Sequence, residues 1–154
     1  MNADEFLKRL KALRSPAVAK SHSHLASNED DVMVGVGMGQ VFALAKEFMN
    51  MDLDEVEKIL ESPIHKMRVG AVSIMDFQAR SKKTTDVRRK ELFKLYIRRY
   101  DRINTWDLVD RSAIHVVGGY LFERPRKVLY KLAKSKQMPE RRTAIVSTLY
   151  FIGK

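Results

Sequence analysis

An aromatic side chain and a carboxylate stand four residues apart in the stretch Ile103–Arg111, which reads Ile-Asn-Thr-Trp-Asp-Leu-Val-Asp-Arg. Trp106 is the only tryptophan of the chain, and Asp110 would lie on the same face one helical turn later. An aromatic face attracts a cation, and a neighbouring carboxylate stabilises positive charge as it develops. The pair therefore suits a cationic or cation-forming substrate.

The same pattern has a plainer structural interpretation. A lone tryptophan is most often a core residue, and Asp110 would then be a solvated or helix-capping charge. The spacing alone favours this alternative, so the rest of the chain has to decide between the two.

Basic charge is concentrated in the second half of the chain. Residues 1–79 carry 9 Lys and Arg against 12 Asp and Glu, whereas residues 80–154 carry 20 against 7. Such asymmetry is typical of a surface that binds a polyanion, most often nucleic acid. A well-solvated basic surface is the alternative. A membrane surface is disfavoured, because the basic segments lack exposed apolar faces rich in Trp or Phe.

The composition excludes several other classes of protein. With 154 residues, of which 45% are hydrophobic, we expect one packed domain over residues 1–154. The chain has no cysteine, which rules out disulfides, thiolate metal sites and a cysteine nucleophile. It also lacks an 18-residue apolar run and the form of a signal peptide. We therefore expect a soluble, cytoplasmic protein.

The histidines offer no clear metal site. His22 and His24 would diverge on a helix, so they do not form a ligand pair. His65 and His115 have no partner nearby in sequence, and we expect both to be core or surface residues rather than bases.

Apolar periodicity predicts helices throughout and requires no strand, so we expect an all-α fold. Asp52 with Glu55 has the pattern of a capping box. The glycine-rich stretch Val34–Gly39 lacks the spacing and the preceding strand of a phosphate-binding loop, so we interpret it as a tight turn. The expected helices cover residues 3–13, 40–49, 53–61, 64–80, 84–99, 106–121, 125–135 and 139–152.

An arginine followed by small and apolar residues recurs along the chain. Arg68–Ile74 is similar to Arg142–Thr148, 74 residues later, and Arg111–Val116 repeats the pattern loosely between them. A period near 37–43 residues with two helices in each unit is typical of HEAT-like repeats. We therefore predict a curved, right-handed α–α superhelix, with these arginines near the Trp106–Asp110 pair on its concave surface.

Three stretches, Asp101–Asp110, Glu140–Thr148 and Glu61–Arg68, resemble those of a known family. From about Val34 onward, the chain is similar to the DNA alkylation repair proteins, AlkD-type alkylpurine DNA glycosylases built from HEAT-like repeats. Family members usually continue for further helix pairs beyond the position of Lys154. We therefore expect a fragment or a short member, whose uncapped C-terminal repeat could pair with a second copy.

The resemblance implies excision of positively charged N3- and N7-alkylated purines from double-stranded DNA, by hydrolysis of the N-glycosidic bond. It makes Asp110 the catalytic carboxylate and Trp106 the ring that packs on the sugar of the lesion. It also implies base release without flipping, no metal or other cofactor, and association with the bacterial nucleoid through DNA binding.

Basic residues near these motifs are the expected DNA contacts. The resemblance places Arg142, or its neighbour Arg141, on the phosphates. We expect Arg111, Arg68 and Lys66 to bind phosphates as well, without reading base sequence.

Two further hypotheses stay open. The chain could be a non-catalytic HEAT-like module that binds nucleic acid by charge, which predicts steep salt dependence without base release. It could also be a protein-interaction scaffold, which predicts no retention on DNA or heparin resin.

Overall fold

The computed structural model of the protein describes residues 1–14 and 35–154. All regular elements in these residues are helices and none is a strand, so the all-α prediction is confirmed. The chain divides into two compact units, Met1–Ile74 and Met75–Lys154. In the part that is described, no helix combines the length and the hydrophobicity that a membrane span requires. His22, His24 and Val34 lie outside the described residues.

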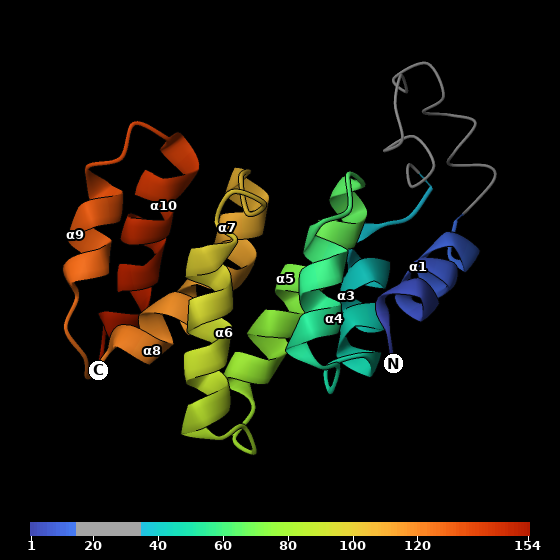
Figure 1. Cartoon of the computed structure of the whole chain (residues 1–154), viewed down its shortest axis with the longest axis horizontal. Coiled ribbons are helices and arrows are strands. Elements are labelled where there is room, and N and C mark those ends of the chain that lie inside the picture. The colour runs from blue at the N-terminus through green and yellow to red at the C-terminus, as the bar shows by residue number, and fades with distance from the viewer. Residues whose placement is uncertain (15–34) are drawn as a thin grey trace. The chain divides into compact units, whose positions relative to one another are not determined.

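The first unit is held together around Phe6. It contains α1 (Ala3–Ala12), α3 (Met38–Glu47), α4 (Leu53–Leu60) and the first part of α5 (His65–Arg80) (Figure 1). The Phe6 ring meets the Phe48 ring edge-on, with centroids 5.3 Å apart. It also lies against Gly70 of α5, where a β-carbon would collide with it. A small residue at position 70 therefore lets α1 pack closely on α5.

The capping box predicted at the start of α4 is wrong. Asp52 is the N-cap residue, but its side chain makes no hydrogen bond to the helix. The Glu55 carboxylate instead accepts hydrogen bonds from the Ala3 N–H, at 2.8 Å, and from the Lys58 amine. Ala3 opens α1, and its N–H has no acceptor within that helix. Glu55 therefore supplies an acceptor for α1 and ties the start of α1 to α4.

The second unit carries the Trp106–Asp110 stretch. After the end of α5 it contains α6 (Asp86–Arg98), α7 (Trp106–Ser112), α8 (Gly119–Leu121), α9 (Lys127–Ala133) and α10 (Met138–Ser147). Helix α10 packs beside α9, as Figure 1 shows, and it also contacts α7. The α7–α10 contact brings two segments about thirty residues apart in sequence face to face.

The helix expected over residues 106–121 is not a regular α-helix. A π-helical turn, Ala113–Gly118, joins α7 to α8. A β-carbon at Gly118 would collide with the Ser147 carbonyl, so glycine allows α10 to approach this turn. The last expected helix is also shorter, because α10 gives way to a 3₁₀ turn, Thr148–Phe151. Apolar periodicity does not distinguish such turns from an α-helix.

Candidate active site

Trp106 stands at the first position of α7 and faces solvent. Thr105 precedes it as the N-cap in an extended conformation, with φ −126° and ψ 157°. Leu108 and Val109 form the buried side of the helix, whereas Trp106 is 61% exposed. The interpretation of Trp106 as a core residue is therefore wrong. A large exposed ring at this position is available to a ligand.

Asp110, one turn after Trp106, is bound by an arginine from α10. Arg142 donates two hydrogen bonds, from Nε to Oδ1 and from Nη2 to Oδ2, each 2.7 Å long. The side chains of Asp110 and Arg142 are 36% and 40% exposed. The hydrogen bond to Asp110 raises the pKa of Arg142, and the nearby negative charge adds to this effect. The arrangement is a fork-shaped ion pair that fixes the plane of a carboxylate still open to solvent.

A buried tyrosine stabilises the contact between the two helices that carry this pair. The Tyr96 hydroxyl of α6 is hydrogen-bonded to the Thr143 hydroxyl of α10 at 2.8 Å, next to Arg142 in the chain. Burial raises the pKa of Tyr96 well above its usual range, while hydrogen bonds with Thr143 and with Ser112 of α7 act in the opposite direction. One neutral hydroxyl therefore bridges α7 and α10. The local sequence pattern does not identify this role of Tyr96, although a tyrosine hydroxyl that is buried generally needs a hydrogen-bond partner.

Two other residues of the second unit that we predict to contact DNA make contacts within the protein. Arg141 donates a hydrogen bond of 2.9 Å to the Ser135 carbonyl between α9 and α10. The Arg111 guanidinium lies over the Phe77 ring, 5.1 Å from its centroid, and 3.8 Å from the Asp76 carboxylate. Both side chains therefore have structural contacts, and their role on DNA stays a prediction.

The remaining two predicted contacts belong to the first unit. Lys66, at the start of α5, donates a hydrogen bond of 2.8 Å to the Val36 carbonyl. Arg68 is half-buried in the same helix. Their contact with DNA likewise stays a prediction.

The family model described as "DNA alkylation repair enzyme" matches residues 6–154, nearly the whole chain. The chain belongs to this family. No curated protein and no solved structure matches it.

Membership of the DNA alkylation repair family gives the Trp106–Asp110–Arg142 arrangement a context. The site offers an exposed aromatic face one helical turn from a carboxylate that an arginine holds. The residues that the resemblance implied for chemistry, Trp106 and Asp110, are therefore side by side on α7, with Arg142 bound to the second of them.

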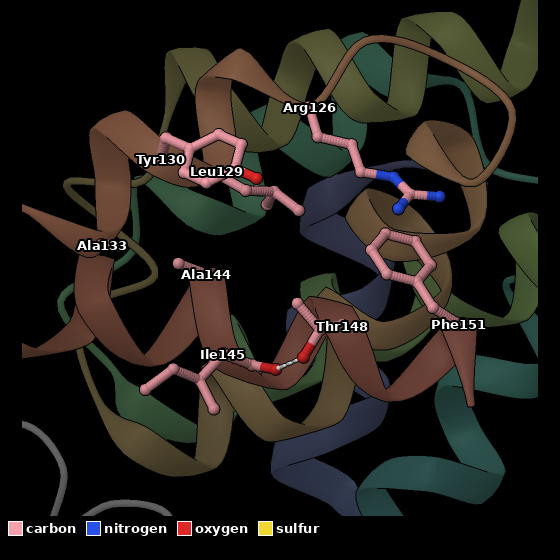
Figure 2. Close-up of a pocket in the computed structure, with 8 residues that line it drawn as sticks. All are labelled: Arg126, Leu129, Tyr130, Ala133, Ala144, Ile145, Thr148 and Phe151. Carbon is pink, nitrogen blue, oxygen red and sulfur yellow. Dashed lines mark hydrogen bonds between the residues drawn. The ribbon is translucent and has the colours of Figure 1, made fainter.

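A separate apolar groove lies between α9 and α10 of this family member. Figure 2 shows that Tyr130 and Ile145 border it and that the Arg126 guanidinium covers the Phe151 ring, 4.0 Å from its centroid. The groove has a volume of about 320 Å³, and Tyr130 and Ile145 are both largely exposed. Pairing with a second copy through the C-terminal repeat, as the sequence suggests, stays a prediction.

Proposed function

We propose that the protein is a DNA glycosylase that removes positively charged N3- and N7-alkylated purines from duplex DNA. The observation that carries the proposal is the exposed Trp106 one turn from Asp110, whose carboxylate is held by Arg142. Membership of the DNA alkylation repair family supports the choice of substrate class.

The reaction needs little help to expel the base. An alkylated purine already carries a positive charge, so the N-glycosidic bond breaks with its electron pair moving to the purine nitrogen. The base leaves neutral, and the sugar becomes an oxocarbenium-like cation at C1′. A water molecule then adds to C1′ and loses a proton to solvent, which leaves an abasic site.

In this proposal, Asp110 stabilises the sugar cation. Its two hydrogen bonds to Arg142 leave further lone pairs that can face C1′ or accept a hydrogen bond from the attacking water. Trp106 would pack against the lesion nucleotide and exclude water while its ring attracts the developing charge. Removing one preorganised electrostatic group of this kind typically costs about 10²–10³ in rate.

Arg142 has a second possible partner in DNA. A phosphate can accept the same fork of hydrogen bonds as a carboxylate. When a phosphate shares or takes the guanidinium, Asp110 gains freedom to face the sugar. DNA binding and exposure of the catalytic carboxylate would then be coupled through one arginine.

The reaction class is tested by comparing two lesions in the same duplex. The protein should release cationic 7-methylguanine and leave neutral uracil in place, because 7-methylguanine departs as a neutral base whereas uracil would have to depart as an anion. Release of both bases at similar rates, or of neither, would contradict the proposal.

One observation favours a non-catalytic nucleic-acid-binding module as the alternative. The Arg142 guanidinium already compensates the charge of Asp110, which weakens the attraction of this carboxylate for a second cation. That hypothesis predicts duplex binding that weakens steeply with salt, together with the absence of base release.

A further inference from the structure

A second polar feature of the Met75–Lys154 unit is a pocket separate from the Asp110–Arg142 pair. Its volume is about 360 Å³. None of the described side chains that line it is acidic. The residues that line it include Arg80, Arg89, His115, Gly119, Tyr150 and Lys154.

His115 is held in one orientation at the wall of this pocket. Its Nδ1 atom lies 3.1 Å from Oδ1 of Asp76, whose side chain is only 2% exposed. A carboxylate accepts hydrogen bonds, so Nδ1 carries the proton and Nε2 is the nitrogen left for the pocket. The charge of Asp76 is balanced by Arg80 and Arg111, at 3.4 Å and 3.8 Å. This pairing could not be predicted from local sequence patterns, because Asp76 and His115 are 39 residues apart.

Arg89 is fixed by the turn between α5 and α6. It donates hydrogen bonds to the Ala79, Ser81 and Thr84 carbonyls, at 3.4, 2.8 and 2.5 Å. These acceptors are neutral, so they position the guanidinium without cancelling its charge. The Asp86 carboxylate, 3.8 Å away, is almost fully exposed and compensates it weakly.

Tyr150 brings the remaining groups together. Its ring meets the His115 ring edge-on at 5.9 Å, and the Lys154 amine lies 4.8 Å from its centroid. Gly119 lies beneath this ring, where a β-carbon would already be 3.4 Å from a ring atom. A larger side chain at position 119 would extend into the pocket, so the glycine keeps it open.

We propose that this pocket binds a phosphate group. Arg89 and Lys154 bring two positive charges to one concave site, and the guanidinium of Arg80, which also pairs with Asp76, adds a third. Guanidinium groups match the oxygens of a phosphate, and the volume accommodates the group with some of its water. The pocket lies beyond the C-terminal end of α10, whereas Arg142 lies in the first half of that helix. The proposal therefore does not depend on base release.

The phosphate could be a diester of the DNA backbone or a free phosphate. Both offer the same oxygens to the pocket, and two measurements distinguish them. The first is a calorimetric titration of the full chain with inorganic phosphate at constant ionic strength. The second is the affinity for an undamaged duplex at several salt concentrations.

The pocket variant is Arg80→Gln/Lys154→Gln, which removes two exposed cations and leaves the carbonyl contacts of Arg89 intact. It also removes the Arg80–Asp76 ion pair, while the Arg111–Asp76 pair stays. The matched control is Lys131→Gln/Lys134→Gln, which removes the same charge from two exposed positions outside the pocket, one in the last turn of α9 and one at its C-cap. Circular dichroism checks that both variants fold.

If the pocket binds free phosphate, we expect the pocket variant to lose at least about tenfold in phosphate affinity, while its affinity for the duplex equals that of the control. If the pocket binds a phosphate of the DNA backbone, we expect the pocket variant to bind the duplex more weakly than the control does. We also expect the slope of its log affinity against log salt concentration to be smaller in magnitude by about two. If the pocket variant and the control behave alike in both measurements, the proposal is overturned.

Discussion

Arg142 and Asp110 are joined by two parallel hydrogen bonds of 2.7 Å across 32 residues of sequence. One partner lies on α10 and the other on α7, so the ion pair also links the two helices. The pair is half-exposed, which leaves it accessible to a ligand. The same two hydrogen bonds therefore stabilise the contact between α7 and α10 and hold the Asp110 carboxylate in position.

Replacement of Arg142 by lysine should separate charge from geometry. Lysine keeps the positive charge but cannot form the two-point contact with Asp110. We expect base release to fall roughly 10- to 100-fold, as is typical when a reacting group shifts by about 1 Å. Single-turnover release of 7-methylguanine measures this. An Arg142→Lys variant with the wild-type rate would show that the fork geometry is not needed.

Trp106 can be altered at little cost to folding. Its ring is 61% exposed, so Trp106→Ala should change the free energy of unfolding by only about 0.5 kcal/mol. We expect base release to drop strongly in Trp106→Ala and partly in Trp106→Phe, since phenylalanine keeps an aromatic face. Tyr130→Ala, at an exposed position of α9, is the matched control and should keep the wild-type rate. A large loss of thermal stability in Trp106→Ala would mean that the ring has a structural role instead.

Tyr96 should matter for stability through its hydroxyl. Tyr96→Phe removes the hydrogen bond to Thr143 while keeping the buried ring. We expect a loss of about 1 kcal/mol in the free energy of unfolding. Denaturant unfolding of Tyr96→Phe, Thr143→Val and the double variant measures the coupling. If the two single effects simply add, the hydroxyls do not stabilise each other.

Low pH should weaken the contact between α1 and α4. The hydrogen bond from Lys58 lowers the pKa of Glu55, and the Ala3 N–H lowers it further. A carboxyl group whose pKa is lower in the folded state stabilises the fold above its unfolded pKa. That contribution is lost as the pH falls below about 4.5, the ordinary value for glutamate, through the lower folded pKa. Unfolding followed between about pH 6 and pH 3 should show a steeper loss in wild type than in Glu55→Gln. Equal slopes would contradict this role of Glu55.

The local part of the site could be predicted from the sequence. Thr105 precedes the helix, and the four-residue spacing places Trp106 and Asp110 one turn apart on α7. These are short-range properties that side-chain type and helical period determine. The same reasoning predicted an all-helical fold, because apolar residues recur at helical spacing in every long segment.

Long-range partners could not be predicted in this way. Glu55 has the spacing of a capping residue, yet it binds Ala3, 52 residues away. His115 has no partner nearby in sequence, yet it pairs with Asp76 on another helix. Arg142 was expected to bind a DNA phosphate, whereas its contact with Asp110 forms only because α10 packs on α7. Each of these contacts depends on the packing of helices, which a helical period does not specify.

The most direct test of the central claim is single-turnover release of 7-methylguanine by Asp110→Asn, beside Asp101→Asn as the matched control. Asp101 is an exposed carboxylate near α7 that pairs only with Arg99 among the described residues, so its loss should leave the rate unchanged. If Asp110 stabilises the sugar cation, Asp110→Asn should lower the rate at least about 100-fold with duplex binding retained. Release by Asp110→Asn at the wild-type rate would contradict the account.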